Sequence, residues 1–436
     1  MNPERVPAPP FDIFNIYFDK IYEPTMHLCF SLDGRIDEER FRSAFMLALG
    51  SDPYLSSRYV EEDGVAYWER IPREKYEKAF VFHTVKEGEQ VPPDVPPGFV
   101  DVYSGPPAAA AIFRANREGK GDVVTVSIHH GCSDVRGLID LASFIFTVYR
   151  KLGEDPGFVP ESRGWYDRDA KKILEKFSEE DIKTEAGKEK RIVDRWAFPF
   201  EYRGHGTPRY AFRIFPEERL SAVKEFGKRY GATVNDVLIA AYILALIEIR
   251  DDPSDRNNLR GVLSSADMRR HLGETGEYSV ENLSIAEMVE IVTGDSFELG
   301  NAVRKVAGIT GERKAGAFGA FDIQFYEDLY TRGFGAIREF FNEILSGYDT
   351  SSLKNPVFSN IGIIDDARFD PGRGPGGSAL NIEYALFLPV ICRPLGFLLC
   401  ASTWRGSLSI QCGYEEGPYS AEKIGTFLDS IDKLLP

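Results

Sequence analysis

The chain has 436 residues, of which 43% are hydrophobic and 13% aromatic, and its 52 Lys and Arg against 68 Asp and Glu give a formal net charge of −16. This length and apolar content predict about two or three folded domains and exclude intrinsic disorder. The acidic surplus argues against a general nucleic-acid binder and against docking on anionic lipid, because both need an excess of Lys and Arg.

The sequence predicts neither an export signal nor a membrane span. No basic stretch followed by an apolar one opens the chain, and the longest apolar run, Val237 to Ile247, is shorter than the roughly 20 residues that cross a bilayer. The five cysteines are odd in number and none lies in a Cys-x-x-Cys pair, which disfavours a disulfide framework and a zinc site. We therefore expect a cytoplasmic globular protein.

Hydrophobic spacing in the first half predicts alternating strands and helices, with Asp37 as a helix cap and Gly50 as a helix stop. The expected elements, in chain order, are a strand at 26–32, a helix at 37–50, a hairpin of 58–60 and 65–68, a strand at 123–130 and a helix with buried positions at 138–148.

Between about 151 and 210 the sequence is crowded with charge and poor in apolar residues. This composition is typical of a solvated crossover between two halves, and equally of a peripheral helix on one domain. We place the boundaries of an N-terminal subdomain at 1–180, of a charged linker at 181–209 and of a C-terminal subdomain at 210–436.

The second half opens like the first, with a strand, a Glu-Glu-Arg sequence and an amphipathic helix, so two similar α/β subdomains are predicted. Thr233 and Asp236 have the spacing of a capping box before a helix that is apolar on nearly all sides and therefore expected to be buried. The other expected elements are strands near 210–215 and at 356–364, 397–403 and 407–413, and a closing helix at 420–435.

Two of the six histidines are adjacent at the end of a predicted strand. Strand alternation sends the side chains of His129 and His130 to opposite faces, and Asp134 follows near the start of the next helix, where the helix dipole favours a carboxylate. A histidine held at a strand end is suited to general-base catalysis at neutral pH. The alternatives are a metal site, a nucleophilic pair of Cys132 and His130, and two partly buried structural histidines.

The segment 129–134, His-His-Gly-Cys-Ser-Asp, resembles the His-His-x-x-x-Asp signature of the condensation-domain and CoA-dependent acyltransferase superfamily. This superfamily includes chloramphenicol acetyltransferase, alcohol acetyltransferases, wax ester synthases and nonribosomal-peptide condensation domains. Further segments that are similar to family motifs, in family order, are 52–59, 232–238, 266–270, 281–284, 358–362 and 402–408. The sequence departs from the family pattern after the signature, where Val135 replaces the usual Gly and a glycine comes only at Gly137.

The resemblance implies a fold of two chloramphenicol-acetyltransferase-like subdomains, with mixed sheets flanked by helices, that meet at a V-shaped cleft with a central tunnel. It also implies that His130 is the general base, that Asp134 pairs with an arginine, expected to be Arg269, and that His129 supports the turn. Other residues are implied by their motifs. The site-supporting ones are Asn282 and Gly137, and the possible channel-lining ones are Ser359, Asn360 and Trp404.

The same resemblance implies that the chain moves an acyl group from a thioester, most of all acyl-CoA, to an alcohol. The transfer would proceed without an acyl-enzyme intermediate. Within the superfamily, the sequence is most similar to freestanding alcohol acetyltransferases and wax ester synthases. One alternative is amide or ester formation from a carrier-protein thioester. Another is a non-catalytic relative that binds an acyl-thioester or a carrier protein. The co-substrate is acyl-CoA or a phosphopantetheine thioester, and we expect no permanently bound cofactor, no metal and no nucleic-acid partner.

Overall fold

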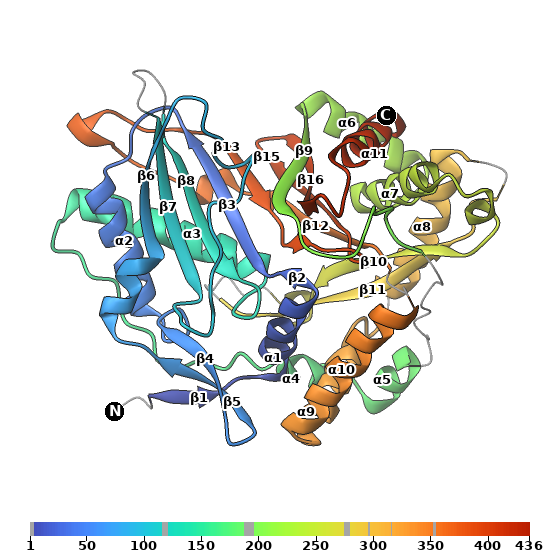
Figure 1. Cartoon of the computed structure of the whole chain (residues 1–436), viewed down its shortest axis with the longest axis horizontal. Coiled ribbons are helices and arrows are strands. Elements are labelled where there is room, and N and C mark those ends of the chain that lie inside the picture. The colour runs from blue at the N-terminus through green and yellow to red at the C-terminus, as the bar shows by residue number, and fades with distance from the viewer. Residues whose placement is uncertain are drawn as a thin grey trace. The chain divides into compact units, whose positions relative to one another are not determined.

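The structure, a computed structural model, describes residues 4–115, 121–186, 196–273, 280–294, 297–314, 316–351 and 355–436. The chain divides into two compact units, each made of more than one stretch of sequence (Figure 1). The first unit comprises Met1–Asp169, Gly276–Asn282 and Ile363–Val390, and the second comprises Ala170–Thr275, Leu283–Gly362 and Ile391–Pro436.

The main sheet of the first unit positions the histidine pair. Its strand order is β13-β3-β8-β7-β6, and all neighbours are antiparallel except β6 and β7, which are parallel. Helices α2 and α3 contact each other and this sheet. The bounds of these elements are β3 Thr25–Leu32, α2 Glu38–Ser51, β6 Phe80–Val85, β7 Ala108–Ala115, β8 Val123–His129, α3 Val135–Glu154 and β13 Ile382–Leu388.

A smaller sheet in the same unit has the order β1-β5-β4. Its strands β4 (Ser57–Glu62) and β5 (Val65–Arg70) form the hairpin that the sequence predicts, and β1 (Arg5–Pro7) pairs antiparallel with β5. Helix α1 (Pro10–Tyr17) follows β1 and is largely buried.

The second unit has its own sheet, in which the strands of that unit follow the order β11-β10-β12-β15-β16-β14 and β9 also pairs with β16. Its core surrounds the apolar helix α7 (Val234–Arg250), which carries the predicted capping box of Thr233 and Asp236. The strands are β9 Thr207–Phe215, β10 Arg260–Asp267, β11 Ser284–Ile291, β12 Val357–Ile364, β14 Ile391–Cys392, β15 Leu398–Trp404 and β16 Ser407–Glu416. The remaining helices are α4 Lys171–Leu174, α5 Glu179–Ala186, α6 Glu217–Arg229, α8 Leu299–Lys314, α9 Ala320–Thr331, α10 Phe334–Ser351 and α11 Ala421–Leu434.

The two units repeat one arrangement, which confirms the prediction of two similar α/β subdomains. Sheet neighbours β3-β8-β7-β6 in the first unit correspond to β9-β16-β15-β12 in the second. The chain order also corresponds, since β3 leads to α2 and β8 to α3 in one unit, while β9 leads to α6 and β16 to α11 in the other.

The observed units differ from the contiguous boundaries that we predicted at residues 180 and 210. The segment Ile363–Val390 belongs to the first unit because it contains β13, which pairs antiparallel with β3. Residues 170–186 belong to the second unit, where α4 and α5 contact α9. This arrangement matches a peripheral helical segment rather than a free crossover; residues 187–195 of the predicted linker lie outside the described residues.

One predicted helix end is wrong. Gly50 lies inside α2, and the helix continues to Ser51. It ends there because Asp52 precedes Pro53, and a residue before proline is driven into the extended conformation that Asp52 adopts.

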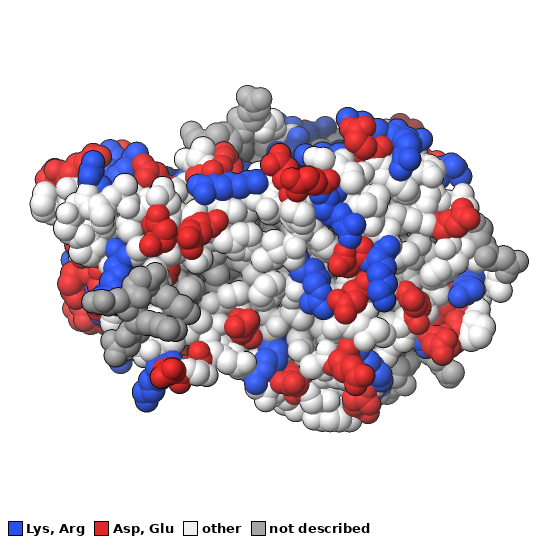
Figure 2. Space-filling view, turned by 90° about the horizontal axis from the view of Figure 1, so that it is seen from above, with Lys and Arg blue, Asp and Glu red and all other residues white. Residues whose placement is uncertain are grey.

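Among the described residues, no single helix is both long and apolar enough to cross a membrane. Helices α6 and α7 meet the length and composition criteria only as a pair, and they are bent by 94° at their junction. Helix α7 is buried in the core of the second unit. On the face that Figure 2 shows, acidic and basic side chains are interspersed.

Candidate active site

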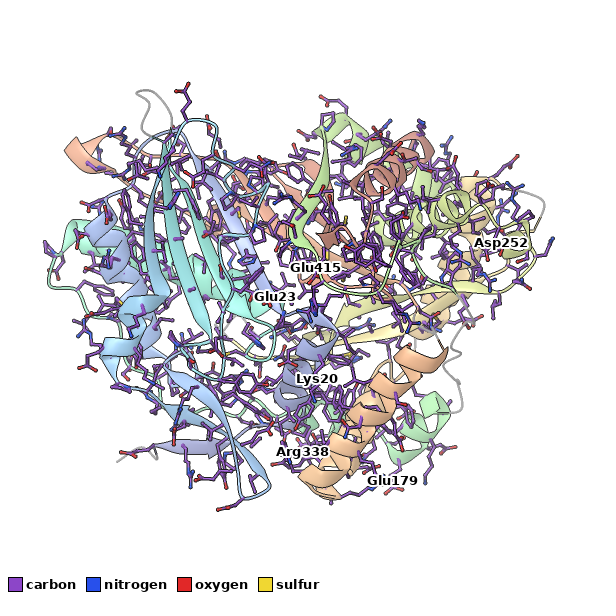
Figure 3. The ribbon with its side chains drawn as sticks, in the orientation of Figure 1. Lys20, Glu23, Glu179, Asp252, Arg338 and Glu415 are labelled. Atoms are coloured by element: carbon purple, nitrogen blue, oxygen red, sulfur yellow. The ribbon has the colours of Figure 1, made fainter. Side chains whose placement is uncertain are left out.

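The turn that follows β8 carries the two adjacent histidines, and backbone hydrogen bonds hold both. The His129 N–H donates to the carbonyl of Pro107 at 2.9 Å, and the His130 N–H donates to the carbonyl of Pro24 at 2.9 Å. Glu23, labelled in Figure 3, precedes Pro24, and its Oε1 accepts a hydrogen bond of 2.8 Å from Thr25 Oγ1. The strand end that carries the imidazoles is therefore attached on both sides.

Close packing explains the glycine at the centre of this turn. A Cβ atom on Gly131 would lie 2.2 Å from Ile16 Cγ1 and 2.9 Å from His129 Nδ1. Both distances are shorter than van der Waals contact, so no larger residue fits without moving α1 or the His129 ring. The sequence therefore needs glycine here for space.

Asp134 is the N-cap of α3. Its Oδ1 accepts hydrogen bonds from the backbone N–H groups of Arg136 at 3.1 Å and Gly137 at 3.3 Å, which have no partner within the helix. Its own N–H donates to the carbonyl of Glu281 at 3.2 Å. This buried carboxylate thus fixes the start of α3 and joins it to the segment that carries Glu281 and Asn282.

The ring of His129 is engaged in holding the turn. Its Nδ1 accepts a hydrogen bond of 2.9 Å from the Gly131 N–H, so the proton of the neutral ring must be on Nε2. The side chain is only 3% exposed, and burial lowers its pKa to about 3, with a further small decrease from His130. His129 is therefore neutral at physiological pH and has no lone pair left for a substrate.

The ring of His130 is in a different situation. It is partly exposed, and its Nδ1 lies 3.3 Å from Oδ1 of Asn282. Burial lowers its pKa from the ordinary value of 6.5, while the Asp134 charge and the hydrogen bond to Asn282 oppose that decrease. The base form therefore predominates at neutral pH. Hydrogen bonds of the ring with the backbone of His130 itself and of Ser133 also oppose the decrease.

A buried charged pair lies behind Asn282. Nδ2 of Asn282 donates to Oδ1 of Asp12 at 3.2 Å, and the same oxygen accepts a hydrogen bond of 3.1 Å from Nη2 of Arg168. The other carboxylate oxygen accepts from Trp68 Nε1 at 2.8 Å. Burial raises the pKa of Asp12 to about 6, although these three donors and the Arg168 charge favour the ionised form.

The structure argues against the nucleophilic pair of Cys132 and His130. The Cys132 thiol is buried, its Sγ lies 3.9 Å from Nη1 of Arg168, and burial raises its pKa to about 12. The thiolate is the nucleophilic form of cysteine, and this thiol stays protonated at neutral pH.

Among the described residues, no group of three or more His, Cys, Asp or Glu side chains is arranged to hold a metal ion.

Other predicted residues lie in the second unit, and their link to the histidine turn stays a prediction. Arg269 follows β10, where its Nη1 donates to Oδ1 of Asp267 at 3.1 Å, and its pairing with Asp134 remains untested. Ser359 on β12 accepts a hydrogen bond of 2.8 Å from Ser265. Asn360 Oδ1 accepts from the Gly362 N–H at 3.0 Å, and Trp404 is buried at the end of β15.

Sequence reasoning missed Asp12, Arg168 and Trp68. Asp12 carries a recognisable signal, because it is a single carboxylate in the mostly apolar helix α1, and buried carboxylates need a partner. Arg168 carries none, because it lies within the charged segment that we interpreted as solvated. In the structure it is 2% exposed and stands 4.2 Å above the ring of Tyr54.

No family model matches the chain, and no curated protein matches it. Solved structures do match over nearly its whole length, and they include an acetyltransferase and condensation domains. The chain therefore shares the fold of these acetyltransferase and condensation-domain structures, which confirms the fold that the sequence resemblance implied.

Three of these structures show how far the similarity extends. A trichothecene 15-O-acetyltransferase from Fusarium sporotrichioides has a TM-score of 0.71 at 14% identity, over 99% of this chain and 94% of that chain. Polyketide synthase associated protein 5 from Mycobacterium tuberculosis has a TM-score of 0.65 at 15% identity, over 98% of both chains. The first condensation domain of the calcium-dependent antibiotic synthetase has a TM-score of 0.65 at 14% identity, over 100% of this chain and 96% of that chain.

Proposed function

We propose that the protein is an acyltransferase that moves an acyl group from a thioester, with acyl-CoA as the expected donor, to the hydroxyl of an alcohol. His130 is the general base. The observation that carries this proposal is the contrast between two adjacent imidazoles, because His129 Nδ1 is occupied by the Gly131 amide whereas His130 is partly exposed and neutral.

The proposed reaction needs one group that takes a proton and later returns it. Nε2 of His130 accepts the acceptor's hydroxyl proton as the oxygen forms a bond to the thioester carbonyl carbon. The tetrahedral intermediate then collapses, the carbon–sulfur bond breaks, and the leaving thiolate takes the proton from the imidazolium. The products are an ester and a free thiol, and the enzyme returns to its starting protonation state. A positioned base of this kind contributes roughly 100- to 10,000-fold to the rate.

The lowered pKa of His130 suits this role. An imidazole that is neutral at pH 7 is ready to accept a proton, and only the neutral form can do so. We therefore expect the rate to fall about tenfold per pH unit below the pKa of His130, which lies under 6.5. The plateau above that value should extend through neutral pH.

Two similarities favour an oxygen acceptor and a CoA donor over the alternatives. The sequence motifs are nearest to freestanding alcohol acetyltransferases, and a trichothecene 15-O-acetyltransferase is among the similar structures. Condensation domains are also among them, so a carrier-protein thioester and an amine acceptor belong in the same experiment.

The test measures free thiol released from acyl-CoAs of several chain lengths, and from an acylated carrier protein, with a panel of alcohols and amines. Wild-type protein should release thiol only when an acceptor is present, and His130→Ala should lower the rate by roughly 100-fold or more. Asn15→Ala, which removes a hydrogen bond of 2.8 Å to the Phe11 carbonyl on α1, is a matched control with an unchanged rate. Thiol release that His130→Ala leaves intact would overturn the mechanism, and no release from any donor would favour a non-catalytic binding protein.

A further inference from the structure

The contacts behind His130 form a chain of hydrogen bonds in which the direction of each bond can be assigned. The chain runs from His130 Nδ1 to Asn282 at 3.3 Å, from Asn282 to Asp12 at 3.2 Å, and from Asp12 to Arg168 at 3.1 Å. All four residues lie in the first unit.

The direction follows from the charge of Asp12. An ionised carboxylate can only accept hydrogen bonds, and Asp12 accepts from Arg168 and Trp68 as well as from Asn282. The atom of Asn282 that faces Asp12 must therefore be the amide nitrogen. Its carbonyl oxygen, which can only accept, is then turned toward His130 Nδ1, so this ring nitrogen must carry the proton.

We propose that Asn282 is a positioning residue that holds His130 in the Nδ1–H tautomer and so presents the Nε2 lone pair to the acceptor substrate. Asp12 and Arg168 act through Asn282, because the buried ion pair determines which end of the amide faces the ring. The inference rests on the proposed function and assigns to these residues a share of the same reaction.

Burial prevents the amide from turning over. Asn282 and Asp12 are each 1% exposed, and Arg168 is 2% exposed. A reversed Asn282 would set its carbonyl oxygen against the carboxylate and its N–H₂ group against the His130 N–H. Both arrangements would leave buried polar groups without partners, which is unfavourable in a low-dielectric interior. The orientation of Asn282 is thus fixed before substrate binds.

The adjacent histidine shows the opposite assignment. Nδ1 of His129 is an acceptor, so its proton is on Nε2, whereas Nδ1 of His130 is a donor. These two adjacent histidines thus carry opposite tautomers, and the side-chain contact that distinguishes His130 is the one with Asn282. Only the His130 tautomer leaves Nε2 able to accept a proton.

The first experiment reads the tautomer directly and does not depend on turnover. Long-range ¹H–¹⁵N correlation spectra of the full-length protein with ¹⁵N-histidine, assigned by loss of the signal in His130→Ala, distinguish a protonated Nδ1 from a protonated Nε2. We expect His130 to be Nδ1–H in the wild type and a mixture of tautomers in Asn282→Ala. The matched control Asn15→Ala should keep the wild-type spectrum, since its amide donates to the Phe11 carbonyl and is not part of the hydrogen-bond chain behind His130.

The second experiment follows thiol release. Asn282→Ala should lower kcat by about ten- to a hundredfold with little change in KM, as outer-shell hydrogen-bond partners do. Asn282→Asp keeps an oxygen that accepts from His130, and it can share one proton with Asp12. It should therefore keep the Nδ1–H tautomer and recover activity as the pH is lowered from 8 to 6.5, whereas Asn282→Ala should not.

The outcomes separate the two proposals. A wild-type His130 with its proton on Nε2, or an Asn282→Ala variant with unchanged tautomer and rate, would overturn the positioning role and leave the proposed acyl transfer standing. A tautomer change in Asn282→Ala without thiol release from any donor in the wild type would support the positioning of the ring and overturn the proposed function. The wild-type spectrum tests the tautomer of His130 by itself. The inference can therefore be refuted even if the Asn282→Ala variant does not fold.

Discussion

The turn between β8 and α3 in the first unit corresponds to the turn between β16 and α11 in the second, and the two differ in chemistry rather than in framework. Each joins a strand of the sheet to an amphipathic helix through a capping residue, Asp134 in one unit and Ser420 in the other. The first turn carries two imidazoles. The second carries Tyr419, whose hydroxyl donates to the Gly396 carbonyl and is fully buried.

The second turn is closed by structural bonds. Glu415, labelled in Figure 3, is buried at the end of β16, and its carboxylate accepts hydrogen bonds from the Gly206 N–H at 2.7 Å and from Arg393 Nε at 3.0 Å. The two turns thus have a similar strand–turn–helix framework, but their polar groups differ. In the first, a partly exposed imidazole is backed by a buried network; in the second, every polar group named here is bonded within the protein.

The largest expected effect is on the rate of thiol release, and it should be seen for a variant in the first turn but not for one in the second. We expect His130→Ala to lower thiol release by roughly 100- to 10,000-fold. Tyr419→Phe should leave the rate unchanged and cost about 1 kcal/mol of unfolding free energy, because it removes one buried hydrogen bond. Initial rates and denaturant unfolding measure the two effects, and a rate loss in Tyr419→Phe would show that the second turn also takes part in the reaction.

The next largest effect concerns space in the first turn. Gly131→Ala should destabilise the protein by about 3 kcal/mol, since the new methyl group overlaps Ile16. Gly425→Ala in α11 meets nothing within 4 Å, and it should stabilise by up to about 1 kcal/mol through helix propensity. Urea titrations of both variants test the pair, and equal midpoints would contradict the tight packing of the first turn.

A pH effect of about 2 kcal/mol should come from His129. Its folded-state pKa of about 3 lies below the ordinary 6.5, so it supports folding above pH 6.5 and loses that contribution as the pH falls toward 3. Between pH 6.5 and 5 the loss is roughly 2 kcal/mol, at about 1.4 kcal/mol per unit.

The measurement is the difference in unfolding free energy between wild type and His129→Gln across this pH range. The raised pKa of Asp12 changes the unfolding free energy with pH in the opposite direction, and the lowered pKa of His27 changes it in the same direction. Both residues are present in wild type and in His129→Gln, so their contributions cancel in the difference. A difference that does not change with pH would mean that His129 is not buried as a neutral ring.

The smallest effects should come from the two helix caps. Asp134→Ala and Ser420→Ala should each cost about 1 kcal/mol of stability, because each removes an acceptor for free N–H groups at a helix start. Only Asp134→Ala should also lower the rate, since its helix start lies four residues from His130. Asp134→Asn, which keeps a capping side chain, should recover most of the stability, and unfolding midpoints together with initial rates test all three.

Local patterns predicted much of this architecture. The strand at 26–32, the cap at Asp37 and the capping box at Thr233 depend on neighbouring residues, and the structure has each of them. The helices α9 and α10 were not predicted, and neither was β13 as a strand of the first sheet. The place of β13 depends on its long-range pairing with β3, which periodicity in one segment cannot reveal.

The candidate site divides in the same way. His129, His130 and Asp134 stand within one hexapeptide, so their spacing alone suggested a turn with a base and a cap. A family motif suggested that Asn282 supports the site, but it did not indicate which residues Asn282 contacts. Asp12 bonds Asn282, which lies 270 positions away, and Arg168, which lies 156 positions away, and no spacing rule predicts contacts at such separations.

The return of Ile363–Val390 to the first unit has a consequence for how this molecule can be divided. A polypeptide cut after residue 180 would leave the backbone of β3 unpaired along one side and exposed to association with other chains. It would also lack Asn282, and with it the neighbour of His130. The contacts of the histidine turn with Glu281 and Asn282 therefore form only after these distant parts of the chain have been synthesised.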